Sequence, residues 1–152
     1  MIANEKRNLI ISYFSEKKQV LTVSQMKDKI NESSKYKFFR FDSDSDSDCG
    51  DTIFLLIKRE DDIIKKIFFS DQSSCLISTS ATSMLCSWLE ENTIPFAKFN
   101  IVLSNVKKMI NGEAYNLDDC KRMEAFKEIN HSSQKSQCLH LVIRSFEYII
   151  NN

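Results

Sequence analysis

The feature that most constrains the fold is a pair of β-rich runs joined by two acidic residues. The runs read TIFLLIKRE (52–60) and IIKKIFFSD (63–71), and Asp61-Asp62 connects them. β-Branched and aromatic residues favour strands, so two such runs with a short polar connection predict an antiparallel hairpin. A third aromatic run, KYKFFRF (35–41), predicts one more strand.

The remainder of the chain is dominated by helical periodicity. Apolar residues recur at spacings of three and four, which predicts helices at 4–18, 76–91, between Pro95 and Gly112, from Asn116 onward, and at 138–150. Segment 19–34 has no clear pattern. The order of helix, small antiparallel sheet and then helices predicts an α+β fold, with a three-stranded sheet packed against about five helices.

Composition limits the size and the class of the protein. A chain of 152 residues suits one domain, which we expect to span 1–152. The 21 basic residues balance the 21 acidic residues, so no basic surface predicts nucleic-acid binding. With two glycines and one proline there is no glycine-rich phosphate loop. No apolar stretch approaches the ~18 residues of a membrane helix, and we expect a soluble, cytoplasmic protein.

Three of the five cysteines, together with one aspartate, form a candidate metal site. In a reducing compartment cysteines more often bind metal, catalyse or pack than form disulfides. Cys49 and Asp51 flank Gly50, which lets the backbone turn so that both side chains face one point. Cys75 and Cys138 each directly precede a predicted helix, where the helix dipole favours a thiolate. These groups can converge on a tetrahedral zinc ion, and the alternative is a set of unrelated core cysteines.

The other cysteines and the histidines are weaker candidates. Cys86 lies eleven residues beyond Cys75 on one predicted helix, roughly 16 Å away, which is too far to share an ion. We expect Cys86 and Cys120 to be buried in the core as small apolar side chains. His131 is a possible nitrogen ligand, whereas we expect a structural role for His140.

An acidic run of alternating aspartate and serine, residues 42–48, directly precedes Cys49. It begins like a calcium-binding loop, but Ser47 stands where that loop needs glycine and Ile53 where it needs glutamate. The run is therefore expected to be a solvated loop, with docking of a basic partner surface as the alternative.

From Cys49 onward the sequence resembles the NifU/IscU family of iron–sulfur cluster assembly proteins. The family's CGD motif stands here as Cys49-Gly50-Asp51, and its second cysteine with a serine-rich helix start stands at 75–84. The 63-residue step from Cys75 to Cys138, and Gln137 before the last cysteine, are similar to the SufU branch. Three further segments are similar to family sequences: 5–18, 105–112 and 117–126.

The resemblance implies a SufE/NifU-like fold and a zinc ion bound by Cys49, Asp51, Cys75 and Cys138. It also implies a PLP-dependent cysteine desulfurase as partner, which displaces Cys49 from zinc and delivers persulfide sulfur to it. Sulfur would then pass to downstream iron–sulfur assembly proteins or apoproteins. Lys135 stands where the family has arginine or lysine, and its charge would offset the −2 charge of the site. The alternatives are a scaffold for a [2Fe–2S] cluster on the same four residues, and a metal-free protein-interaction module.

Overall fold

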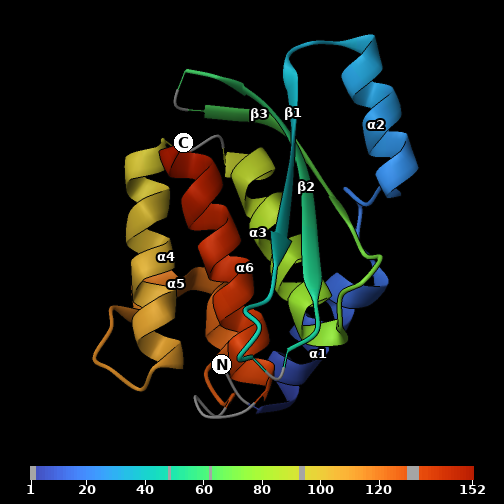
Figure 1. Ribbon diagram of the computed structural model, residues 1–152. Coiled ribbons are helices and arrows are strands. Elements are labelled where there is room, and N and C mark those ends of the chain that lie inside the picture. The colour runs from blue at the N-terminus through green and yellow to red at the C-terminus, as the bar shows by residue number, and fades with distance from the viewer. Residues whose placement is uncertain (1–2, 48, 62, 93–94, 130–133) are drawn as a thin grey trace.

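Three antiparallel strands, adjacent in the order β1-β2-β3, form the sheet that the sequence predicts (Figure 1). The computed structural model describes all residues except 1–2, 48, 62, 93–94 and 130–133. The strands are β1 (Tyr36–Asp42), β2 (Thr52–Glu60) and β3 (Ile63–Ser70). The predicted hairpin and the additional strand are therefore confirmed.

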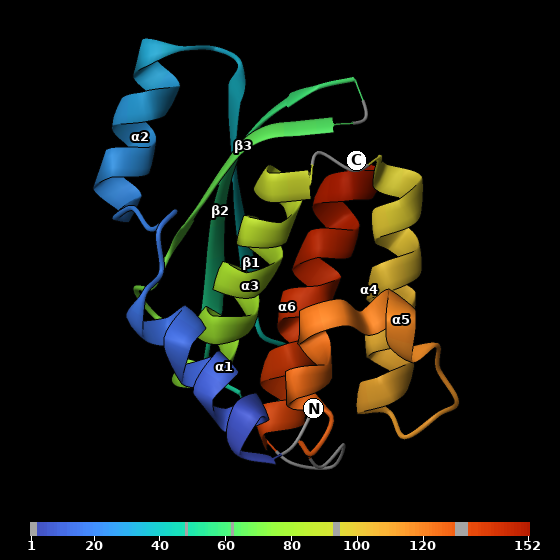
Figure 2. The same ribbon diagram turned by 180° about the vertical axis from the view of Figure 1, so that it is seen from behind.

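Most of the helices lie on one face of this sheet. The helices are α1 (Ala3–Ser15), α2 (Val23–Glu32), α3 (Leu76–Asn92), α4 (Phe96–Ile110), α5 (Leu117–Cys120), the 3-10 helix η1 (Lys121–Phe126) and α6 (Gln134–Asn151). Helices α3 and α6 lie next to the sheet, and α4 packs beside α6 (Figures 1 and 2). The α+β class is thus confirmed.

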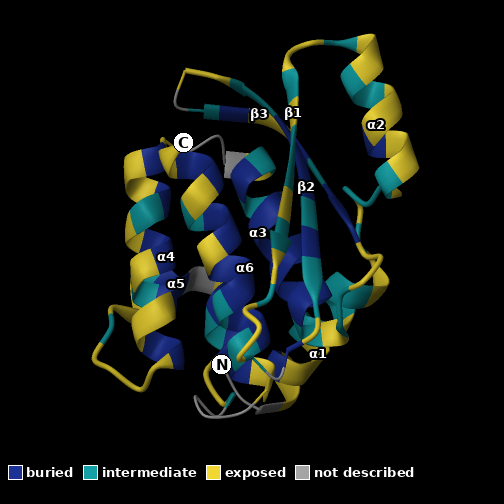
Figure 3. Cartoon of the chain, viewed as in Figure 1, coloured by how far each residue is buried: buried dark blue, intermediate teal, exposed yellow. Residues whose placement is uncertain are grey.

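The core forms between one face of the sheet and helices α3, α4 and α6. Alternate residues of β2 are buried there, including Leu55, which pairs with Phe69 of β3. This alternation follows from the two-residue period of a strand. Phe99 of α4 and Phe146 of α6 belong to the same buried cluster. Figure 3 shows the resulting difference between the buried inner helices and the largely exposed α2.

Helix α2 covers part of the opposite face of the sheet and was not predicted. Its only buried residue is Met26, so its apolar stripe is narrow. A capping box defines its first turn, because the Thr22 side chain accepts from the Gln25 N–H while the Gln25 side chain accepts from the Thr22 N–H. Lys29 lies 5.1 Å from the centroid of the Phe68 ring and adds a cation–π contact to the sheet.

Two predicted helices differ in detail. Helix α6 begins at Gln134, four residues before the predicted start at 138, so the first turn is polar and precedes the apolar stripe. The helix that opens after Asn116 is only one turn long before the backbone tightens into η1. The Asn116 side chain accepts from the Asp118 N–H at 3.0 Å, as its predicted capping role requires.

The chain direction brings five element ends together at one end of the sheet. Strand β1 ends there, β2 begins, β3 ends, and α3 and α6 both begin (Figure 1). Residues 49–51 lie in the connection from β1 to β2, so they lie near the first turns of two helices. Within the described ranges, no helix combines the length and apolar character needed to cross a membrane.

Candidate metal centre

Three thiols meet at this end of the sheet. The Cys138 Sγ lies 3.0 Å from the Cys49 Sγ and 3.6 Å from the Cys75 Sγ. A carboxylate oxygen of Asp51 joins Cys49 and Cys138 in a group whose ligand atoms all lie within 4.8 Å of one another. Four tetrahedral ligands with zinc–sulfur bonds of ~2.3 Å place their sulfur atoms roughly 3.8 Å apart. The Cys75–Cys138 spacing is close to this value, and the Cys49–Cys138 spacing is shorter. Cys75 contacts Cys138 but does not belong to the group of three ligand atoms.

Cys75 and Cys138 lie at different places relative to their helices. Cys75 directly precedes α3, as predicted, and its Sγ accepts from the Ser78 N–H at 3.5 Å, in the manner of a capping side chain. Cys138 lies in the second turn of α6, so the prediction that it precedes a helix is wrong. The helix dipole therefore does not act on Cys138 as predicted, because its effect is confined to the first turn.

The role predicted for Gly50 is also corrected. Gly50 does not adopt a positive φ, and a Cβ at this position would meet no atom within 4 Å. The thiol of Cys49 and the carboxylate of Asp51 still lie in one group of ligand atoms, on either side of the exposed Gly50 in the connection before β2. Glycine is not sterically required for this arrangement.

A buried serine that the sequence analysis did not single out contacts two of the candidate ligands. Ser78 of α3 is fully buried, and its Oγ donates to Asp51 Oδ2 at 2.6 Å. Its backbone N–H donates to the Cys75 Sγ. Ser78 lies three residues after Cys75, and this helical spacing was the available indication that it faces the same site. One residue thus orients both a thiol and a carboxylate.

The protonation states of the site follow from its burial. Burial raises the pKa of Cys49, although a hydrogen bond from Cys138 opposes this effect. Burial also raises the pKa of Cys138, and the neighbouring Cys49 and Cys75 thiols raise it further. Burial would raise the pKa of Asp51 as well, but hydrogen bonds from Ser78, Cys75 and Cys138 outweigh it and leave the pKa lowered. Without a metal, Cys49 and Cys138 are protonated at neutral pH beside an ionised carboxylate.

The remaining predicted candidates lie outside this cluster. Cys86 and Cys120 are both fully buried in the core, as expected. Burial raises the pKa of Cys86 well above its ordinary value and that of Cys120 to about 11, so neither is a reactive thiolate. Lys135 is exposed in the first turn of α6, one turn before Cys138. His131 lies outside the described residues.

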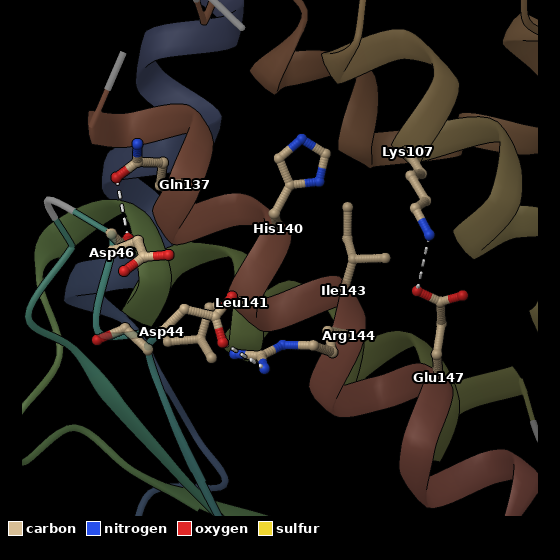
Figure 4. Close-up of a pocket in the computed structure, with 11 residues that line it drawn as sticks. Asp44, Asp46, Lys107, Gln137, His140, Leu141, Ile143, Arg144 and Glu147 are labelled. Atoms are coloured by element: carbon tan, nitrogen blue, oxygen red, sulfur yellow. Dashed lines mark hydrogen bonds and ion pairs between the residues drawn. The ribbon is translucent and has the colours of Figure 1, made fainter. Parts of the chain in front are cut away.

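The acidic run is solvent-exposed at Asp44 and Asp46, as expected of a solvated loop, but it is also bonded to α6. Arg144 of α6 forms an ion pair with Asp44 at 3.2 Å, and the Ser47 Oγ donates to Gln137 Oε1 at 2.9 Å. The run borders a pocket of about 470 Å³ along α6, which His140 also lines (Figure 4). Burial, and then the charge of Lys107, lower the pKa of His140. Asp48 lies outside the described residues.

Comparison with known proteins places the fold. No family model matches the chain, and no curated protein matches its sequence. Among solved structures, a protein assigned as an iron–sulfur cluster assembly scaffold for the SUF system of Fervidobacterium islandicum AW-1 is similar, with 17% identity over 92% of each chain and a TM-score of 0.74. A hypothetical protein is similar with 16% identity over 99% of this chain and 100% of that one, at a TM-score of 0.73.

A third similar structure extends the comparison to nitrogen-fixation proteins. The N-terminal part of a NifU-like protein from Brucella abortus has 12% identity over 68% of this chain and 70% of that one, with a TM-score of 0.58. At such identities the likeness shows a shared fold. The predicted fold of the SufU and NifU-like iron–sulfur cluster assembly proteins is thus confirmed.

Proposed function

We propose that this chain is a zinc-dependent sulfur acceptor of iron–sulfur cluster assembly. The observation that carries the proposal is the cluster of the Cys49 and Cys138 thiols with the Asp51 carboxylate at one end of the sheet, with the Cys75 thiol 3.6 Å from that of Cys138. Soft thiolates with one carboxylate suit Zn²⁺, and the 3.6 Å spacing of the Cys75 and Cys138 sulfur atoms is near that of a tetrahedral site. The fold shared with a SUF-system scaffold and a NifU-like protein points to the same process.

Cys49 is the ligand best placed to accept sulfur. Cys138 is held within the second turn of α6, and Cys75 is held at the start of α3. Cys49 alone lies on a connection between strands, beside an exposed glycine. It can therefore leave the cluster by a local movement of the loop. Cys138 would have to move with α6, and Cys75 would have to give up its bond to the Ser78 N–H in the first turn of α3.

The transfer step needs only a thiolate and a persulfide. When bound, zinc supplies the charge that keeps the thiols deprotonated. The Cys49 thiolate attacks the terminal sulfur of a persulfide on the partner cysteine desulfurase. A new sulfur–sulfur bond forms at Cys49 as the donor's sulfur–sulfur bond breaks, and the donor cysteine leaves as a thiolate. No external oxidant or reductant is required.

The partner and the route of the sulfur belong to the same proposal. The donor would be a PLP-dependent cysteine desulfurase, and the acceptors would be downstream assembly proteins or apoproteins. Lys135 is exposed on the turn before Cys138, so it can attract an anionic persulfide and offset the negative charge of the site.

The test is sulfur uptake from a cysteine desulfurase, followed by mass spectrometry of the intact chain. Cys49→Ala should abolish the gain of one sulfur atom. Cys86→Ala is the matched control, because Cys86 is a buried thiol outside the cluster and its loss should leave uptake unchanged. Undiminished uptake by Cys49→Ala would refute the assignment of the acceptor.

A second candidate function is a scaffold on which a [2Fe–2S] cluster is assembled by the same four residues. It is favoured by the scaffold assignment of the similar SUF-system protein. Anaerobic incubation with ferrous iron, cysteine and a desulfurase distinguishes the two functions. Stable, stoichiometric iron and acid-labile sulfide would favour the scaffold, whereas a persulfide on Cys49 without bound iron would favour the sulfur acceptor.

A further inference from the structure

The acidic segment before Cys49 is fastened to α6 at both of its ends. We call residues 43–47 the strap. At its first end, Arg144 Nη1 lies 3.2 Å from Asp44 Oδ1, and Arg144 Nη2 donates to the Asp42 carbonyl at 2.9 Å. At its far end, Ser47 Oγ donates to Gln137 Oε1 at 2.9 Å. Gln137 and Arg144 lie two turns apart along α6, and Figure 4 shows both beside the strap.

The strap is bonded to the backbone of the proposed sulfur acceptor. Ser47 Oγ accepts from the Cys49 N–H at 3.0 Å while it donates to Gln137. The Cys49 thiol in turn lies 3.0 Å from that of Cys138, the residue that follows Gln137 in α6. Helix α6 therefore positions Cys49 through two contacts. One joins the thiols of Cys49 and Cys138, and the other joins the Cys49 N–H to Gln137 through Ser47 of the strap.

We propose that Arg144 is a positioning residue that sets how readily Cys49 leaves the cluster, acting through the strap. The proposal rests on the proposed function, in which Cys49 must be shielded at rest and released to meet the donor. Cys49 is 3% exposed, so its thiol reacts only after a local opening. Without Arg144 the strap loses its anchor near Asp44 and keeps the bond to Gln137 and the bond from the Ser43 N–H to the Asp51 carbonyl, so this opening becomes more frequent.

The ion pair of Arg144 with Asp44 is weak enough for the strap to detach from α6. The Arg144 and Asp44 side chains are 50% and 76% exposed, so water and salt weaken their attraction. The hydrogen bond to the Asp42 carbonyl fixes the direction of the guanidinium group. An exposed anchor of this kind can open without unfolding the core, because neither side chain belongs to the buried cluster.

Site-resolved alkylation of the full, zinc-loaded chain tests the proposal. Iodoacetamide is added, and the labelling rates of Cys49 and Cys75 are followed separately by peptide mass spectrometry. Arg144→Ala should speed labelling of Cys49 by about fivefold and leave Cys75 unchanged. Arg144→Lys, which keeps the attraction to Asp44 with fewer donors, should restore part of the protection.

The control is Lys107→Ala, which removes another ion pair of α6, to Glu147 at 3.8 Å, without touching the strap. It should leave both rates as in the unmodified chain. An unchanged Cys49 rate in Arg144→Ala would overturn the proposal, and so would equal acceleration at Cys49 and Cys75, because general loosening would explain it.

A metal-free arm separates this proposal from the proposed function. The strap contacts involve no side-chain atom of the metal ligands, so Arg144→Ala should also speed Cys49 labelling in the presence of EDTA and a phosphine reductant. Loss of that effect in the metal-free chain would overturn the strap proposal. Sulfur uptake by Cys49→Ala would instead overturn the function while leaving the strap result intact.

Discussion

Ser78→Ala is the most informative single change at the proposed metal centre. The hydroxyl donates to Asp51 Oδ2 at 2.6 Å from a fully buried position. A hydrogen bond to a charged group contributes about 1.5–3 kcal/mol. Loss of a residue that orients a metal ligand typically lowers affinity about 10–100-fold, which is roughly 1.4–2.7 kcal/mol. We therefore expect the zinc dissociation constant of Ser78→Ala to rise by about that factor, measured by competition with a chromophoric chelator.

Ser83→Ala provides the matched control. Ser83 is a buried serine of the same helix, and its hydroxyl has no hydrogen-bond partner within the described residues. Its removal should leave zinc affinity unchanged and cost little stability. The reasoning would be refuted if Ser78→Ala bound zinc within about twofold of the unmodified chain, or if both variants lost affinity equally.

Three further predictions follow from the site and its surroundings. Burial raises the pKa of Cys49 and Cys138, so zinc binding at neutral pH must displace at least the protons of these two thiols. Calorimetry in buffers of different ionisation enthalpy should detect the released protons. The affinity for zinc should fall by about 100-fold for each pH unit by which the pH is lowered. Lys135→Ala should leave zinc content unchanged and slow sulfur uptake by about threefold at low salt, with the difference vanishing at high salt. Cys86→Ala should lower the free energy of unfolding in urea by about 1 kcal/mol, because it leaves a small cavity, and should retain zinc in full.

The parts of the fold with strong local patterns were predictable. The hairpin was predicted to within one residue, because β-branched and aromatic residues fill both runs and a short acidic connection separates them. Helix α4 begins directly after Pro95 and ends two residues before Gly112, which has a φ of 76°. These features depend on residues that are neighbours in sequence.

Features that depend on distant residues were not predictable in the same way. The ion pair that holds the acidic run joins Asp44 to Arg144, which are 100 residues apart. No local pattern distinguishes that arrangement from a solvated loop. Helix α2 was missed for a different reason, because it is only ten residues long and its narrow apolar stripe buries a single side chain. Its capping box, Thr22 to Gln25, was the available indication.

The candidate site was predictable from the sequence only in part. Cys49, Asp51 and Cys138 were predicted as ligands and do lie together, and the Cys75 thiol reaches Cys138. Spacing alone allowed unrelated core cysteines equally well, because only the order of strands and helices brings these residues to one end of the sheet. Ser78 was missed since a serine-rich helix start offers several equivalent hydroxyl groups, and the one that faces Asp51 depends on the helix orientation.

The central claim is that the four scattered residues hold one zinc ion. The most direct measurement is elemental analysis of the chain purified without added iron or zinc, set against protein concentration, for the unmodified chain and for Cys75→Ser. We expect about one zinc per chain and its loss in the variant, with a lower melting temperature. The absence of zinc from the unmodified chain, or full retention of zinc and melting temperature by Cys75→Ser, would contradict the account.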